Sequence, residues 1–281
     1  MCRFVSYIGK KPVVLSDILE KPSNSLIQQS RHALKLKIPV NADGFGIAWY
    51  QKSIDSRPGI FKSTQPAWND LNLKHISDRI SSRCFLGHVR ASTIGNVSRS
   101  NCHPFAYQKY SFCHNGGIQN FSLIRRVLTA SLSDEIYQQI SGQTDSEHFF
   151  SLLMDLFLKT KQRKFSTFLD CFKQAVNMVV DYQKQAKIEE LAHLNTVITD
   201  GSELLATRYT TNSEALSLYY TVGHHMNVKN EVPMMHFDSE NPGAVLVASE
   251  PLGDYAKEWH EIPVNHALLV NKTLKTSLHK L

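Results

Sequence analysis

Hydrophobic residues along the chain gather in ten short segments that are rich in β-branched and aromatic side chains, a pattern that predicts β-strands. These segments are residues 2–8, 46–50, 60–63, 85–91, 110–113, 196–199, 204–210, 217–222, 244–249 and 266–270. Three longer segments, residues 122–140, 146–159 and about 166–185, carry hydrophobic residues at helical spacing instead. They predict three amphipathic helices.

The predicted helices lie in the middle of the chain, with strands before and after them. This order argues against a repeated βαβ unit and favours the α+β class, with two sheets and helices packed on them. Short turns at Asp200-Gly201 and Asn212-Ser213 predict antiparallel neighbours among the last strands. Because the chain has no Pro/Gly/Ser-rich linker, long charge run or internal repeat, we expect one domain over residues 2–281.

Composition and charge narrow the function classes. The net charge is +6, but Lys and Arg are scattered without a basic stripe or a nucleic-acid motif, so we expect no nucleic-acid partner. No apolar segment approaches the roughly 20 residues that span a bilayer, and the N-terminus lacks the apolar core of a signal peptide. Five cysteines in a chain of this size indicate reduced thiols. We therefore expect a cytoplasmic protein without membrane association.

Cys2 is the first candidate for catalysis. A small residue at this position permits removal of Met1, which would leave a cysteine with a free α-amino group of pKa about 7.7–8.0. The thiol is then the nucleophile, and the amine can take its proton and later deliver one to the leaving nitrogen. The alternative is a thiol that merely packs in the first strand.

The segment Cys113-His114-Asn115-Gly116-Gly117 directly follows a predicted strand. Acyl chemistry passes through a tetrahedral oxyanion that needs fixed hydrogen-bond donors. The Asn115 amide and the N–H of Gly116 could supply two such donors. An ordinary Asn-Gly-Gly turn is the alternative.

Arg90 and Thr93 lie where a predicted strand runs into a loop. Arg90 could bind an α-carboxylate with two parallel hydrogen bonds, and Thr93 could add a hydroxyl donor. A structural arginine is the alternative. Farther along, Thr144 and Glu147 have the spacing of a capping box at the start of a helix. Once they satisfy the cap, the Asp145 carboxylate remains free to bind an ammonium group.

These four elements supply a nucleophile, oxyanion donors, a carboxylate clamp and an ammonium acceptor for the α-amino-acid end of a γ-glutamyl amide. The sequence resembles the class II glutamine amidotransferases in MCRF at Cys2, HVRAST at Arg90, HNGG at Asn115 and TDSE at Asp145. The segments NADGFGIAWY, NCHPF and AVLVASEPL resemble the stand-alone members. FKSTQPAWNDLNL and SNCHPF…HNGGIQNF are similar to the amidotransferase-like subunits of fungal glutathione-degradation complexes and, more distantly, to ergothioneine-pathway γ-glutamyl amidohydrolases.

The resemblance implies a four-layer αββα sandwich of two mainly antiparallel sheets, the fold of N-terminal-nucleophile hydrolases. It implies Cys2 as nucleophile, Asn115 and Gly116 as oxyanion hole, and Arg90 and Asp145 as anchors of the glutamyl group. It also places Asp43 in a loop near the nucleophile and His103 beside the pocket. No cofactor or metal is implied, and the reaction would pass through a γ-glutamyl thioester on Cys2.

One departure from the family bears on the substrate. Several biosynthetic members read Arg-Trp-Ala-Thr-His around the clamp, whereas Ala91 and Ile94 stand here. A smaller, more apolar rim leaves room for a γ-glutamyl compound bulkier than glutamine, such as glutathione. The chain leaves no room for a synthetase domain, so either water accepts the γ-glutamyl group or a separate synthetase or metallopeptidase subunit is a partner.

Two other functions remain open at the level of sequence. A metal site could use soft ligands among Cys84, His88, Cys102, His103, Cys113, His114 and the pair His224-His225. However, no CxxC or HExxH spacing occurs, and adjacent Cys and His on a strand point to opposite faces. The chain could also be a catalytically silent subunit that binds a partner, although it keeps Cys2, Asn115, Arg90 and Asp145 together.

Overall fold

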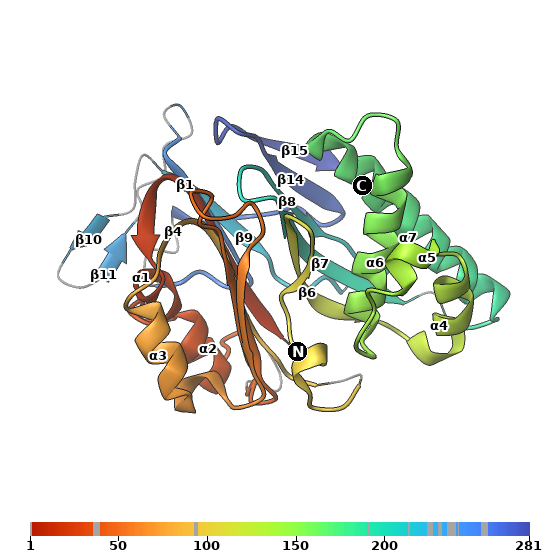
Figure 1. Ribbon diagram of the computed structural model, residues 1–281, viewed down its shortest axis with the longest axis horizontal. Coiled ribbons are helices and arrows are strands. Elements are labelled where there is room, and N and C mark those ends of the chain that lie inside the picture. Colours follow the sequence, from red (N-terminus) through yellow and green to blue (C-terminus); the bar gives the residue numbers. More distant parts are fainter. Residues whose placement is uncertain are drawn as a thin grey trace.

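The strands of the protein form two antiparallel sheets, as seen in a computed structural model (Figure 1). The structure describes residues 2–35, 40–92, 95–189, 191–212, 214–223, 227–229, 232–234, 240, 242–253 and 258–281. The first sheet has the strand order β13 (His260–Glu261), β9 (Tyr219–Gly223), β12 (Ala244–Ala248), β1 (Arg3–Val14), β4 (Ser81–Val89), β2 (Phe45–Trp49) and β3 (Gly59–Ser63). The second has the order β15 (Thr276–Lys280), β14 (His266–Val270), β8 (Leu204–Arg208), β7 (Ala192–Thr199), β6 (Tyr110–Ile118) and β5 (Phe105–Tyr107). A short hairpin pairs β10 (Asn227–Lys229) with β11 (Val232–Met234).

Helices cover the outer face of each sheet. The first sheet carries α1 (Ser16–Leu19), α2 (Leu26–Arg31) and α3 (Leu71–Ser77). The second carries α4 (Phe121–Ala130), α5 (Asp134–Tyr137), α6 (Asp145–Lys159) and α7 (Phe168–Gln185). Three single-turn 3-10 helices connect these elements: η1 (Ala67–Asn69), η2 (Arg99–Asn101) and η3 (Phe165–Thr167).

Three hydrophobic clusters hold the layers together. One joins α1–α3 to the first sheet, one fills the space between the sheets, and one joins the second sheet to α4–α7. The two-residue period of β1 shows how one strand serves two layers, because Phe4 and Ile8 enter the inter-sheet cluster while Val5 and Tyr7 enter the cluster below α1–α3. The three clusters separate four layers: helices, first sheet, second sheet and helices. The predicted αββα sandwich of the α+β class is therefore confirmed.

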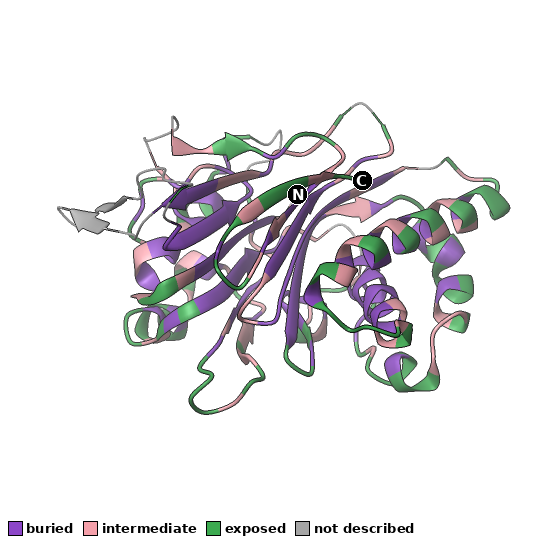
Figure 2. Cartoon of the chain, turned by 90° about the horizontal axis from the view of Figure 1, so that it is seen from above, coloured by how far each residue is buried: buried purple, intermediate pink, exposed green. Residues whose placement is uncertain are grey.

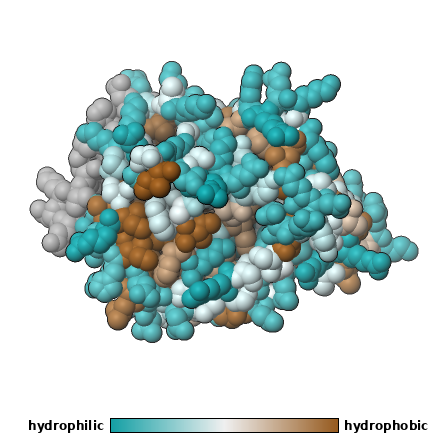
Figure 3. All heavy atoms as spheres, viewed as in Figure 1, coloured by the Kyte–Doolittle hydropathy of each residue, from teal (hydrophilic) through white to brown (hydrophobic). Residues whose placement is uncertain are grey.

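The views of the molecule agree with this layering. Buried residues colour the strands at the centre in Figure 2, while the outer sides of the helices are exposed. Hydrophilic side chains cover most of the right-hand part of the face in Figure 3, where α4–α7 lie in Figure 1. Helices α4 and α7 bury one apolar stripe and leave the rest to solvent, whereas α6 is buried over most of its length. Among the described residues, every helix is too short or too polar to cross a membrane.

Of three details of the predicted elements, two are wrong and one is confirmed. The helix predicted over residues 122–140 is two helices, α4 and α5, because the Ser133 backbone N–H donates to Asp155 Oδ1 of α6 at 3.0 Å. The Asp200-Gly201 turn does join antiparallel neighbours, β7 and β8. The predicted turn at 212–213, of which Ser213 lies outside the described residues, is followed by β9 in the other sheet, so β8 and β9 are not neighbours.

Candidate active site

Cys2 immediately precedes β1, a central strand of the first sheet. Its thiol donates a hydrogen bond to the Ala91 carbonyl oxygen, with 3.5 Å between Sγ and O. Burial raises the pKa of the Cys2 thiol, and the positive charge of Arg90 opposes that rise while the negative charge of Asp145 adds to it. The thiol is therefore protonated at neutral pH, and a nucleophile at this position needs a base.

The residue after Cys2 is fixed by a buried ion pair that sequence reasoning missed. Arg3 Nε lies 2.8 Å from Glu250 Oε1, and both side chains are 1% exposed. The same carboxylate accepts the backbone N–H groups of Leu34 and Lys35, and Arg3 Nη1 donates to the Cys2 carbonyl oxygen at 3.1 Å. This network holds the start of β1 in one position. Arg3 and Glu250 are 247 residues apart in sequence, so no local pattern indicates their ion pair.

Asn115 and Gly116 lie inside strand β6 rather than in a turn, so the alternative of an ordinary Asn-Gly-Gly turn is wrong. Asn115 pairs with Asn195 of β7 and is completely buried, yet neither its Nδ2 nor its Oδ1 has a hydrogen-bond partner in the described structure. Gly116 has φ +143°, and a Cβ there would lie 1.9 Å from the His193 carbonyl oxygen. Only glycine lets β6 approach β7 this closely. A buried amide without a partner is costly, which is typical of a group kept for a ligand.

The position of Cys113 relates Asn115 to Cys2. Cys113 shares the inter-sheet cluster with Phe4, and strand alternation puts Asn115 on the same face of β6 as Cys113. Burial raises the pKa of the Cys113 thiol, and the charge of Cys2 raises it further, so the two thiols lie near each other. The structure therefore brings Cys2 and Asn115 to the same end of the inter-sheet space.

Arg90 follows β4 and is buried, with its guanidinium held by the loop that comes after it. Nη1 donates to the Asn96 carbonyl oxygen at 3.2 Å and Nη2 to that of Gly95 at 3.4 Å. The Arg90 carbonyl oxygen accepts the N–H of Asp43 at 3.0 Å, and Asp43 Oδ2 accepts the N–H of Ser92 at 2.7 Å. The loop with Asp43 therefore lies beside the arginine loop. Thr93, the predicted hydroxyl donor, and Ile94 lie outside the described residues.

Asp145 is the first residue of α6 and is buried. The prediction that its carboxylate is free is wrong, because Oδ2 accepts the N–H of Ile118 at 2.7 Å and Oδ1 accepts the N–H of Ser146 at 2.8 Å. A carboxylate offers about four acceptor positions, and the Ser146 hydroxyl also donates to Oδ1 at 3.4 Å, so one position remains for a ligand. The charge of Asp145 also acts on the Cys2 thiol, so the two side chains share one site.

The predicted capping box forms only in part. Thr144 Oγ1 accepts the N–H of Glu147 at 3.2 Å, as expected of an N-cap. Glu147 does not return the bond to Thr144; its carboxylate accepts the N–H groups of Ser141 at 2.9 Å and Gly142 at 2.7 Å instead. The side chain thereby fixes the turn that leads into α6.

His103 is a buried ring that stacks on His88, with 4.1 Å between ring centroids. His88 Nε2 donates to the His114 carbonyl oxygen at 3.2 Å, whereas neither ring nitrogen of His103 has a partner among the described residues. Burial lowers the pKa of His88 to about 3 and that of His103 well below its usual value. Both rings are therefore neutral at physiological pH, and neither carries a charge to a substrate.

Lys62 of β3 is a further candidate that sequence reasoning missed. Its Nζ lies 4.9 Å from the centroid of the Phe105 ring, and the side chain lines a cavity of about 230 Å³ between β3, β5 and α6. Burial lowers the pKa of Lys62, and its charge in turn acts on the thiols of Cys102 and Cys113. A lone lysine in a strand has no sequence signature, so only the fold reveals it.

The site contains side chains suited to acyl transfer, with a thiol, amide donors and two opposite charges. No group of three or more His, Cys, Asp or Glu side chains in the described part of the chain is arranged to hold a metal ion.

Comparisons with known proteins agree with this chemistry. A model of the family "Glutamine amidotransferases class-II" matches residues 26–276. The Saccharomyces cerevisiae protein named probable glutamine amidotransferase DUG3 is 37% identical, over 97% of this chain and 82% of its own length. The gamma-glutamyl-hercynylcysteine sulfoxide hydrolase of Mycolicibacterium smegmatis is 26% identical, over 95% and 94%. The solved structure of a glutamine aminotransferase class-II domain protein from Silicibacter pomeroyi superimposes with a TM-score of 0.68 at 23% identity, over 100% and 99% of the two chains.

Proposed function

Because the chain belongs to the class II glutamine amidotransferases, we propose that it is one catalytic domain that hydrolyses the γ-glutamyl amide bond of glutamine or of a γ-glutamyl compound such as glutathione. The observation that carries the proposal is the completely buried Asn115 amide without a partner, on the strand whose Cys113 lies near Cys2. The hydrolase relative from Mycolicibacterium smegmatis, whose name specifies a γ-glutamyl substrate, supports this substrate class.

The reaction proceeds in two halves. Once Met1 is removed, the α-amine of Cys2 takes the thiol proton, and the sulfur attacks the γ-carbonyl carbon. The oxyanion that forms accepts hydrogen bonds from Asn115 Nδ2 and the Gly116 N–H. The amine then delivers the proton to the leaving nitrogen, the C–N bond breaks, and a γ-glutamyl thioester remains. Water attacks this thioester by the same sequence, which releases glutamate and restores the thiol.

Arg90 and Asp145 bind the other end of the substrate. The guanidinium of Arg90, oriented by two loop carbonyls, binds the α-carboxylate. The acceptor position of Asp145 that no protein donor occupies binds the α-ammonium. Asp43 holds the loop at Ser92, and the neutral ring of His103 stacks on His88 beside the site. Thr93, outside the described residues, is proposed to add a hydroxyl donor to the α-carboxylate.

A hydrolysis screen tests this function. Purified protein is assayed with glutamine, glutathione and a γ-glutamyl anilide, and in parallel with N-acetylated and α-amidated analogues of each. We expect turnover of the parent compounds only, with loss of turnover by orders of magnitude in Cys2→Ser and in protein that retains Met1, as judged by intact mass. Equal hydrolysis of the blocked analogues would refute the γ-glutamyl substrate class, and full activity with Met1 attached would refute the role of the amine.

The acceptor is tested in the same screen. We expect water to serve as acceptor for the chain alone, and a partner synthetase or metallopeptidase subunit to change the rate or the product when it is added. Saturable binding of a partner by a protein that hydrolyses none of the compounds would favour a catalytically silent subunit instead.

A further inference from the structure

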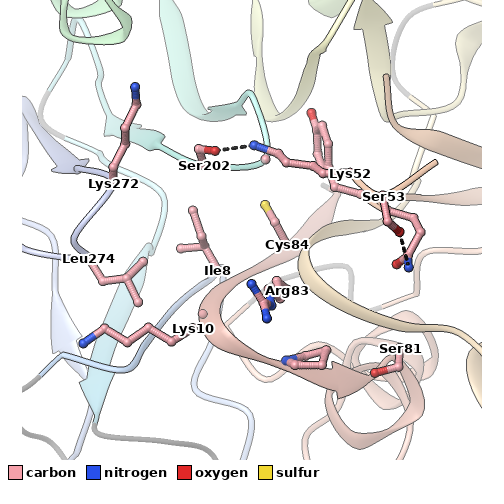
Figure 4. A pocket seen from close by; sticks show the side chains of 15 residues that line it. Ile8, Lys10, Lys52, Ser53, Ser81, Arg83, Cys84, Ser202, Lys272 and Leu274 are labelled. Carbon is pink, nitrogen blue, oxygen red and sulfur yellow. Dashed lines mark hydrogen bonds between the residues drawn. The ribbon is translucent and has the colours of Figure 1, made fainter. Parts of the chain in front are cut away.

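A second pocket lies at the opposite end of the sandwich from Cys2. Its volume is about 880 Å³, and it opens between the far end of β1, the segment after β2, the start of β4 and the β14–β15 turn (Figure 4). Ile8, which lines it, is six residues from Cys2 along an extended strand, a distance of about 20 Å. The pocket is therefore separate from the candidate active site.

Four cations from four separate segments line this pocket: Lys10, Lys52, Arg83 and Lys272. The sequence shows Lys and Arg as scattered, but folding brings these four together around one concave surface. No carboxylate lines the pocket, and none within the described ranges lies within ion-pair distance of any of the four. Lys52 donates to Ser202 Oγ, an uncharged partner that orients the ammonium without neutralising it.

Two acids lie beside the pocket, and the first of them, Asp200, already has partners. Asp200 directly precedes the lining residues Gly201 and Ser202, but its Oδ2 lies 3.2 Å from Lys109 Nζ. Its Oδ1 accepts the N–H groups of Ser202 at 2.9 Å and Glu203 at 3.0 Å. The second acid, Glu203, interacts with the charges of Lys272 and Lys52, so the uncompensated positive charge of the pocket lies at Lys10 and Arg83.

The walls also carry apolar and hydroxyl groups. Figure 4 shows Ile8 and Cys84 between Lys52 on one side and Arg83 and Lys10 on the other. Leu274 and Tyr50 add apolar surface, and Ser53 and Ser81 add hydroxyls. Small-molecule sites are concave, have volumes of about 300–1,000 Å³ and combine apolar walls with a few placed polar groups. Lys and Arg are the side chains that bind phosphate oxygens.

We propose that this pocket binds an organic polyphosphate, a compound such as a nucleoside di- or triphosphate that carries two or more phosphoryl groups on an apolar ring. The four cations bind the phosphates, and the exposed Pro12, with Ile8 and Leu274 buried behind the surface, contacts the ring. An acidic protein segment would need a flatter and longer surface than this concave pocket. This site does not depend on the proposed hydrolase activity.

Titration calorimetry on the full chain tests the proposal, with ATP, AMP, adenosine and inorganic tripolyphosphate as probes. We expect saturable binding of ATP that is tighter than that of AMP, weaker binding of tripolyphosphate, and none of adenosine. The double variant Lys10→Glu/Arg83→Glu should weaken ATP binding about tenfold or more, because it removes two ion contacts and adds repulsion. The charge-matched control Lys74→Glu/Lys161→Glu, at two exposed lysines outside the pocket, should bind ATP as the unmodified protein does.

Should the double reversal not fold, as judged by its thermal unfolding midpoint, Lys10→Gln/Lys272→Gln serves in its place with a smaller expected loss. The absence of saturable ATP binding at low salt would overturn the proposal. So would equal loss in the control variant, which would mean attraction to the net charge alone. Saturable binding of an oligo-glutamate peptide but not of ATP would overturn it in favour of an acidic protein partner.

Discussion

Asp145 Oδ2 accepts the backbone N–H of Ile118 at 2.7 Å, so the carboxylate that begins α6 also fixes the end of strand β6. Asn115 lies three residues earlier on that strand. One side chain therefore links the proposed ammonium acceptor to the proposed oxyanion hole. A substitution at Asp145 can disturb the site in two ways, by removing a charge or by releasing the strand, and suitable variants separate them.

Asp145→Asn should raise KM strongly and also lower the free energy of unfolding, because its amide nitrogen cannot accept the Ser146 N–H. Its amide oxygen can still accept the Ile118 N–H, but the negative charge that binds an α-ammonium is gone. Asp145→Ala should raise KM and also lower the unfolding free energy by about 1–3 kcal/mol, because two buried N–H groups lose their acceptor. Steady-state kinetics and urea unfolding of both variants measure this. An unchanged KM in Asp145→Asn would mean that Asp145 is purely structural.

Arg90→Ala should abolish the preference for substrates with a free α-carboxylate over their α-amidated analogues. We expect it to raise KM for the γ-glutamyl substrate by the equivalent of about 2–5 kcal/mol of lost charge pairing. The α-amidated analogue, which lacks the carboxylate, should be handled equally poorly by the variant and by the unmodified protein. Arg99→Lys, at an exposed arginine of η2, is the control and should behave as unmodified protein. A preserved preference for the free carboxylate in Arg90→Ala would show that another group binds it.

His88 should make the protein less stable in acid. Burial lowers its pKa from 6.5 to about 3, so between these values the unfolded chain binds a proton that the folded chain does not. The stability that depends on neutral His88 is complete above pH 6.5 and is lost as the pH falls toward 3, by on the order of 5 kcal/mol.

His88→Gln should therefore flatten part of the fall of unfolding free energy with pH, because a glutamine amide can donate to the His114 carbonyl oxygen but does not titrate. Urea unfolding at a series of pH values from about 6.5 downward measures the slope. His75→Gln, at an exposed position of α3, is the control and should keep the original slope. Identical slopes for His88→Gln and unmodified protein would contradict the prediction.

The sequence predicted the fold class and most strands because those depend on local hydrophobic patterns. It failed where a distant residue decides the outcome. The break between α4 and α5 depends on Asp155 of α6, and the anchored start of β1 depends on Glu250. The N–H that occupies Asp145 belongs to Ile118, 27 residues earlier in the chain. No local spacing encodes such partners. The sequence pattern therefore predicts one long helix over residues 122–140 and an Asp145 carboxylate without a backbone partner.

In the candidate site, too, local motifs predict some residues and only the fold reveals others. Motifs identify Cys2, Asn115, Arg90 and Asp145 as candidates, and the charges of Arg90 and Asp145 both act on the pKa of the Cys2 thiol. Lys62 and the four cations of the second pocket have no motif, since each is a single residue in its own segment. These residues can be recognised as parts of a site only after folding brings their segments together.

Asn115 offers the sharpest test, because its two proposed properties lead to opposite effects on activity and on stability. Its side-chain amide is buried without a partner in the described structure, so it destabilises the folded protein as long as no oxyanion is bound. Asn115→Ala should lower kcat about 100- to 1000-fold with little change in KM, and should leave the free energy of unfolding unchanged or raise it.

Asn195 is the matched control, since it is equally buried and lies directly opposite Asn115 on β7. Its Nδ2 donates to the carbonyl oxygens of Leu216 at 3.2 Å and Ser217 at 3.1 Å, so Asn195→Ala should lower the unfolding free energy by about 1–3 kcal/mol. Its kcat should fall far less than that of Asn115→Ala. If instead Asn115→Ala is the less stable of the two and keeps its kcat, then Asn115 holds the strand pair together and the oxyanion donor must be sought elsewhere.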